Sequence, residues 1–211
     1  MDRELLRRIV IVSSAGVLGL YYGLYYGVAV TEENPPHPKL IAAAKERFGE
    51  DAQCYMDTFS APRFLSPRTN TNTKGNSLAR AHFTCLAYQP EIFLFSRLGM
   101  GERVARAGLG FDHGFEPNVP LEFKEGARCV FNSVRSITDN EVVFDWGDTK
   151  SGGQTIVAKD PSSGKVMFGT VTRLRSQDMT LGSLIWQFHR IYSRILVCSI
   201  AAELQATGGR P

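Results

Sequence analysis

The chain has 211 residues, 43% of them hydrophobic, and its 24 basic and 21 acidic residues leave a net charge of +3. So balanced a charge argues against nucleic acid as a partner. The four cysteines are far apart and form no CxxC pair, which excludes the common zinc-binding and small disulfide-rich classes.

The first predicted element is an apolar run over residues 9–30, which contains no charged side chain. As a helix it would be about 33 Å long, enough to cross a bilayer core of roughly 30 Å. Arginines precede the run and Glu32 and Glu33 follow it. Because positive charge favours the cytoplasmic or matrix side, we expect a single-pass anchor with its N-terminus inside and the body outside. A cleaved signal peptide is the alternative interpretation.

Glycines recur along one face of this run. Gly19, Gly23 and Gly27 are four residues apart, and Gly16 precedes them. Small residues at this spacing let two membrane helices approach closely. The pattern predicts packing against a helix of another subunit, whereas a plain lipid-facing anchor would make the glycines incidental.

The body contains no N-x-[ST] glycosylation sequon, although we expect it to face outward. This weakly favours a mitochondrial inner membrane, or a bacterial membrane, over the secretory pathway. The predicted organisation is an anchor at 1–30, a linker and short helix at 31–49, a folded domain at 50–205 and a tail at 206–211.

Within the body, the pattern begins helical and then alternates. We expect helices at 38–48, 77–86 and 90–107, with a strand at 53–59 and loops at 62–76 and 108–126. Strands are predicted at 128–137, 140–146, 154–159 and 166–175, joined by turns. A long amphipathic helix at 181–204 closes the chain. The prediction is an α+β two-layer fold, in which an antiparallel meander packs on the C-terminal helix.

Three stretches resemble a branch of uncharacterised small proteins in the START-like, helix-grip superfamily, which includes polyketide cyclases and lipid-transport proteins. They are PEIFLFSRLGMGERVARAGL at 90–109, FGTVTRLR at 168–175 and WQFHRIYSRIL at 186–196, and the resemblance covers roughly residues 50–205. It implies a curved antiparallel sheet around a long C-terminal helix, with a pocket for an apolar ligand between them. The added membrane anchor departs from that pattern.

His189 and Arg190 are the sharpest polar pair, and Trp186 and Tyr192 lie beside them in sequence. These four residues are the candidate ligand contacts of the pocket that the resemblance implies, with His189 facing the cavity as its polar group. Neighbours on a helix point about 100° apart, so His189 and Arg190 cannot both face one site. The alternative is a structural His189, hydrogen-bonded within the fold.

No motif for covalent, metal or nucleotide chemistry appears: G-x-S-x-G, HExxH and Walker A are all missing. We therefore predict a non-catalytic protein without cofactor or metal. The first hypothesis is an accessory subunit of a membrane complex, most plausibly a respiratory-chain assembly of the mitochondrial inner membrane. Its partners would be membrane lipids and other subunits contacted through the anchor. The second is a membrane-tethered protein that binds or transfers a lipid or another hydrophobic ligand.

Overall fold

The computed structural model describes residues 30–61, 75–87, 122–129, 132–147, 152–173 and 178–207, and the side chains of 75–76, 84–87 and 178–188 are outside that description. The predicted membrane helix and the predicted helix at 90–107 lie outside the described residues. None of the described helices has the length and apolar character needed to span a membrane.

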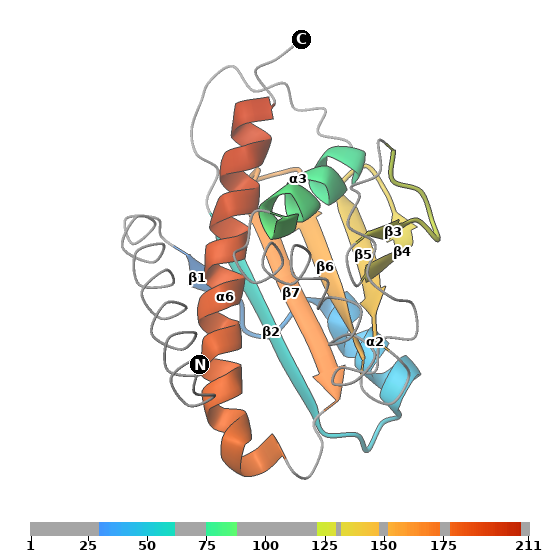
Figure 1. Cartoon of the computed structure of the whole chain (residues 1–211), viewed down its shortest axis with the longest axis vertical. Helices are drawn as coiled ribbons and strands as arrows, with labels where there is room; N and C mark the ends of the chain where they lie inside the picture. The colour runs from blue at the N-terminus through green and yellow to red at the C-terminus, as the bar shows by residue number, and fades with distance from the viewer. Residues whose placement is uncertain are drawn as a thin grey trace, which may run out of the picture.

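The described strands form one seven-stranded antiparallel sheet in the order β1-β2-β7-β6-β5-β4-β3 (Figure 1). Strands β3 to β7 follow one another as a meander. β2 pairs with β7, and β1 pairs with β2 at the edge of the sheet. The strands are β1 (Thr31–Glu32), β2 (Cys54–Ala61), β3 (Arg128–Cys129), β4 (Asn132–Ile137), β5 (Glu141–Trp146), β6 (Gly153–Lys159) and β7 (Val166–Arg173).

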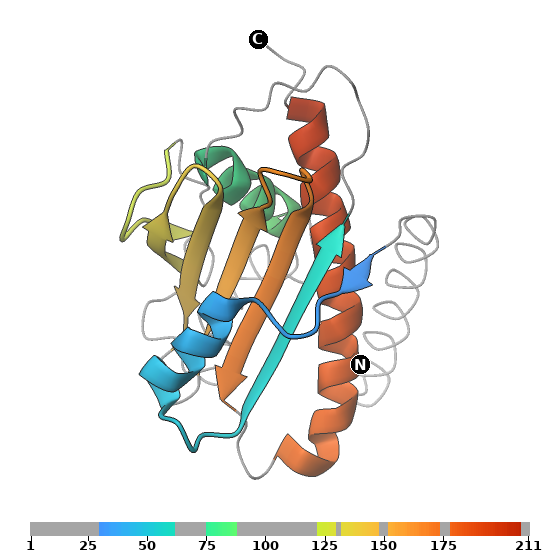
Figure 2. The same cartoon turned by 180° about the vertical axis from the view of Figure 1, so that it is seen from behind.

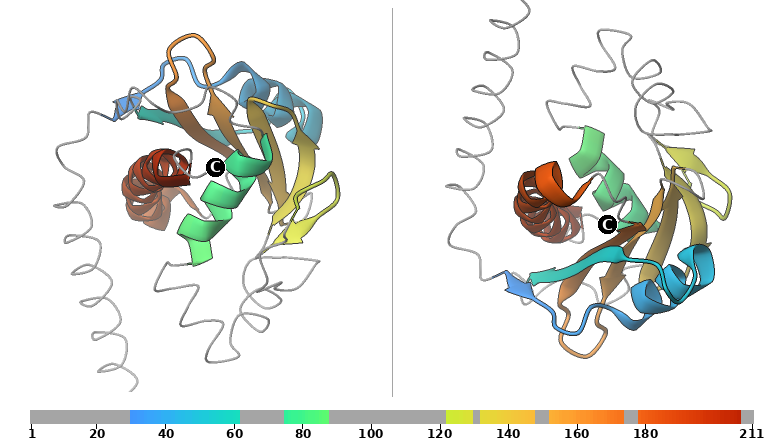
Figure 3. Two further views of the ribbon diagram at one scale, coloured as in Figure 1. Left: turned by 90° about the horizontal axis from the view of Figure 1, so that it is seen from above. Right: turned by 90° about the horizontal axis from the view of Figure 1, so that it is seen from below.

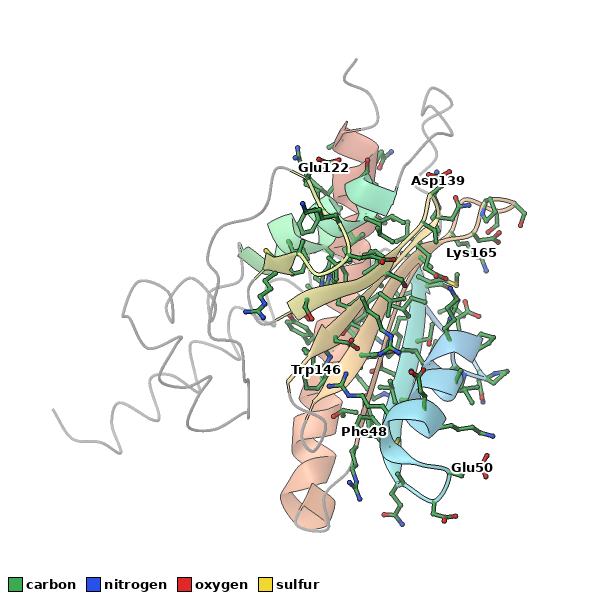
Figure 4. The ribbon with its side chains drawn as sticks, turned by 90° about the vertical axis from the view of Figure 1, so that its right-hand side faces the viewer. Phe48, Glu50, Glu122, Asp139, Trp146 and Lys165 are labelled. Atoms are coloured by element: carbon green, nitrogen blue, oxygen red, sulfur yellow. The ribbon has the colours of Figure 1, made fainter. Side chains whose placement is uncertain are left out.

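Helices cover both faces of this sheet. The long helix α6 (Asp178–Thr207) and the shorter α3 (Gly75–Ala87) lie on its concave face, whereas α2 (Pro38–Phe48) crosses the opposite face (Figures 2 and 3). Viewed from the side, Phe48 at the end of α2 and Trp146 at the end of β5 flank the same region of the sheet (Figure 4). The predicted two-layer arrangement is therefore wrong, because α2 adds a third layer.

Strand alternation explains why there are two cores. Successive residues of a strand point to opposite faces, so one strand can feed two packing layers. On the face of α3 and α6, Phe59, Phe144 and Phe168 join a large buried cluster. On the face of α2, alternate positions such as Val143 and Ile156 pack against that helix.

Docking of α2 depends on a close approach at Gly169 in β7. A Cβ at this position would lie 2.8 Å from Leu40 Cδ1 and 2.9 Å from the Asp57 carbonyl oxygen, so only glycine leaves room for Leu40. At the other end of α2, Arg47 donates to Asp145 Oδ1 at 3.0 Å and to the Gly153 carbonyl at 3.1 Å. The helix is thus fixed at both ends.

Most predicted elements are confirmed with shifted ends. The helix at 38–48 matches α2, the meander is present, and the C-terminal helix is longer than predicted. Residues 128–137 were predicted as one strand, but β3 and β4 pair with each other, with Cys129 opposite Asn132. The chain therefore reverses between them, which its loose alternation did not indicate. β1 was not predicted, because two residues are too few to show a pattern.

Candidate functional site

The candidate site lies between β2 and the part of α6 that begins at His189. The His189 Nδ1 atom is 3.3 Å from Asp57 Oδ2, and Tyr55 donates its hydroxyl hydrogen to the same oxygen at 2.7 Å. The Tyr55 and His189 rings meet edge to face, with centroids 5.5 Å apart. One helix turn further along, Ser193 Oγ lies 3.3 Å from the same His189 nitrogen. We call these four residues the Asp57 cluster.

Burial makes the Asp57 cluster unusual. The Asp57 side chain is 1% exposed, whereas that of His189 is 26% exposed and so reaches the surface. Asp57 Oδ1 is buried and has no hydrogen-bond partner among the described residues. A buried carboxylate is costly unless its charge and lone pairs are satisfied, so an orphaned oxygen requires an explanation.

Tyr55 acts as a hydrogen-bond donor in this cluster. Burial, together with the negative charge of Asp57 and the hydrogen bond to it, holds the pKa of the Tyr55 hydroxyl far above its ordinary value. The phenol therefore keeps its proton, and its oxygen cannot serve as a base near neutral pH. Tyr55 therefore acts toward Asp57 Oδ2 as a donor only.

Threonines of β7 and β6 continue the polar surface on the same face of the sheet. Thr170 stands directly opposite Asp57 in the β2–β7 pair, and Thr155 stands opposite Thr170 in the next pair. The Thr170 hydroxyl donates to the Gln154 carbonyl at 3.0 Å, and the Thr172 hydroxyl donates to the Gly152 carbonyl at 3.1 Å. Each hydroxyl has one hydrogen, so both threonines are left with acceptor lone pairs only.

The other half of this face is apolar and filled. Phe59, Phe168 and Val157 lie one row along from the threonines and are at most 3% exposed. His82 of α3 is stacked on Phe144, with centroids 5.0 Å apart. Burial lowers the pKa of His82 to about 3, so its ring is neutral, and its Nδ1 atom has no partner within the described part of the chain.

The geometry decides against a serine nucleophile. In a catalytic triad the acid and the serine contact different nitrogens of the histidine. Here Asp57 and Ser193 both approach Nδ1, so His189 cannot take the Ser193 proton while Asp57 holds that nitrogen. Among the described residues no group of His, Cys, Asp or Glu has the arrangement of a metal site. The Asp57 cluster does place hydrogen-bond donors and acceptors together at one position between β2 and α6.

The predicted site residues of α6 separate in the structure. His189 contacts Asp57 of the sheet, whereas the exposed Arg190 forms an ion pair with Glu32 of β1. Tyr192 is partly buried against the large core cluster, with its ring 6.2 Å from that of His189. The Trp186 side chain and Gly16, Gly19, Gly23 and Gly27 lie outside the description, so their predicted roles stay predictions.

Sequence reasoning missed Asp57, Tyr55 and the threonines. One signal was available: Asp57 stands in the middle of a strand whose alternate positions Phe59 and Ala61 are apolar and fully buried. A charged residue on the buried side of a strand is rare unless it has a partner. The sequence also indicated Ser193 as a neighbour of His189, since it follows His189 by one helix turn.

Comparisons of this chain with protein-family models, with curated proteins and with solved structures find no match.

Proposed function

We propose that this chain is a membrane-tethered binding protein, which holds a small ligand between α6 and the concave face of the sheet. The observation that carries the proposal is Asp57: a buried carboxylate with one unpartnered oxygen, next to a histidine that reaches the surface. Unpartnered buried polar atoms mark positions where a ligand or water completes the hydrogen bonding.

The arrangement of elements supports a START-like, helix-grip domain. Strands β3 to β7 run in order, β2 pairs with β7, and α6 lies in the concave face. The ligand site that the resemblance implies lies between such a helix and sheet. Because the apolar half of this face is filled by α3 and α6, we assign the ligand to the polar half beside Asp57.

Hydrogen exchange during a ligand screen tests this proposal. The full chain is reconstituted in nanodiscs and screened against small amines, alcohols and carboxylates. We expect at least one class to protect the amides of 54–61 and 189–196, and this protection should be lost in Asp57→Asn. The control Asp139→Asn, which changes an exposed turn carboxylate, should keep it. If no class of compound slows the exchange of these amides, the proposal is refuted.

The tether is part of the same proposal and rests on the uncharged run at 9–30. We expect the full chain to stay in the membrane pellet after an alkaline carbonate wash. A chain beginning at residue 31 should be released by the same wash. Release of the full chain would remove the membrane from the proposal and leave the binding site untouched.

A second candidate function, that of an accessory subunit in a membrane complex, is favoured by the spacing of Gly19, Gly23 and Gly27. This spacing suits close packing of two membrane helices. Blue-native electrophoresis of the source membranes should then find the chain in a complex that Gly23→Leu dissociates, while Ala29→Leu leaves it intact. Migration of the unaltered chain only as a free monomer would exclude this function.

A further inference from the structure

The Asp57 side chain has no ion pair with an arginine among the described residues. The two arginines of α6 are directed elsewhere: Arg190 pairs with Glu32, and Arg194 lies 3.7 Å from the same carboxylate. Arg194 also stacks over the Phe59 ring at 5.3 Å. Within the described residues, the polar contacts of the Asp57 side chain are Tyr55 and His189, and both reach Oδ2.

The threonine hydroxyls on the same face as Asp57 act as acceptors toward any further group. Thr170 and Thr172 spend their single hydroxyl hydrogens on the carbonyl oxygens of Gln154 and Gly152. The bond of 3.4 Å between Thr155 and Thr170 must then be donated by Thr155. Asp57, Thr170 and Thr172 lie on one face of two neighbouring strands, so their carboxylate and hydroxyl oxygens form a surface of hydrogen-bond acceptors.

Such a surface selects its ligand by charge and by hydrogen-bond donors. A carboxylate or phosphate would be repelled by Asp57. A neutral alcohol offers one donor and no charge. A protonated amine offers up to three N–H donors and a positive charge on a compact group. Charge-assisted bonds of this kind are stronger than neutral ones, and more so where water is excluded.

We propose that the Asp57 cluster binds the protonated amino group of an organic amine, which donates hydrogen bonds to Asp57 Oδ1 and to the Thr170 or Thr172 hydroxyl. This inference rests on the proposed function and names the chemical class of its ligand. Because His189 is 26% exposed whereas Asp57 is 1% exposed, we place the amine's organic portion along His189, toward the surface of α6.

Four-carbon probes with different head groups test the inference without relying on a variant. Butylammonium, butyltrimethylammonium, butan-1-ol and butyrate are titrated by calorimetry into the full chain in phosphatidylcholine nanodiscs, in sodium chloride and again in potassium chloride. We expect butylammonium to bind at least tenfold more tightly than the other three, with little difference between the two salts.

Variants then locate the binding. Asp57→Asn should weaken butylammonium binding at least tenfold, and Thr170→Val, which preserves side-chain shape, should weaken it severalfold. Asp139→Asn removes one exposed charge and should change nothing. If Asp57→Asn fails to fold, the comparison of probes and Thr170→Val still decide the matter.

Four results would overturn the inference. Equally tight binding of butyltrimethylammonium and butylammonium would contradict it, because butyltrimethylammonium has the charge without N–H donors. Much weaker binding of butylammonium in one salt than in the other would indicate a site for that inorganic cation. Binding of butan-1-ol or butyrate alone, lost in Asp57→Asn, would leave the proposed function standing with another ligand class. No binding by any probe would count against both.

Discussion

His82 is a buried histidine whose protonation is expected to govern stability in acid. It is 2% exposed, and burial lowers its pKa to about 3, whereas an unfolded chain would take up the proton near 6.5. Between these values the unfolded state binds more protons, so the free energy of unfolding falls as pH falls. The stability is fully present above about pH 6.5 and is lost progressively toward about pH 3.

We predict a slope of up to about 1.4 kcal/mol per pH unit from His82 within this window. Chemical denaturation at a series of pH values would measure it. His82→Phe should flatten the curve, because phenylalanine retains the stacking on Phe144 and cannot be protonated. An unchanged slope in His82→Phe would show that other groups cause the acid sensitivity.

The Tyr55 hydroxyl is expected to stabilise the buried Asp57 side chain through its hydrogen bond. Because its hydrogen bond ends on a buried carboxylate, Tyr55→Phe should lower the free energy of unfolding by about 1–2 kcal/mol. The same change should cost much less in an Asp57→Asn background. A double-mutant cycle by urea denaturation measures this coupling, and additive effects would contradict it.

At the scale of elements, the packing of α2 on the sheet should depend on the absence of a side chain at Gly169. A Cβ there would crowd both Leu40 and the backbone of β2, so Gly169→Ala should destabilise the fold by about 1–3 kcal/mol. Leu40→Ala opens space on the same side. We therefore expect the double variant to lose less stability than the sum of the two single changes, measured by thermal unfolding. Exchange rates of the amides of 38–48 should rise in Gly169→Ala.

Local pattern was sufficient for several elements. The helix at 38–48 has a proline at its start and ends before Gly49, whose φ of 89° is a conformation that glycine adopts without strain. The strands β5 to β7 follow their alternation of apolar residues. The two strands of the 128–137 segment could not be separated, because the chain reversal falls within a stretch with no glycine or proline.

At the scale of the whole molecule, Glu32 connects the segment that follows the apolar run to α6. Its carboxylate pairs with Arg190 and lies near Arg194, while β1 pairs with β2 and Val30 packs on the core. The position of the chain leaving the apolar run is thus fixed beside the helix that carries His189.

Loss of this link should loosen α6 locally. Exposed ion pairs contribute little to global stability, so Glu32→Gln should cost less than about 1 kcal/mol. We nevertheless expect faster amide exchange in 30–33 and 189–196, because two arginines lose their partner. Glu50→Gln removes a carboxylate that is 81% exposed beside Lys45 and should change neither region. Equal effects of both substitutions would show that Glu32 has no special role.

The sequence by itself determined the succession of elements, the antiparallel meander, the long C-terminal helix and the candidate His189, because these depend on periodicity over neighbouring residues. Only the tertiary structure decided that α2 covers the second face, and that Asp57 meets His189 across 132 positions of sequence. The physical reason is that burial, charge compensation and orphaned hydrogen-bonding atoms belong to pairs of elements in contact. A strand residue such as Asp57 acquires its chemistry only when a distant helix excludes water from it.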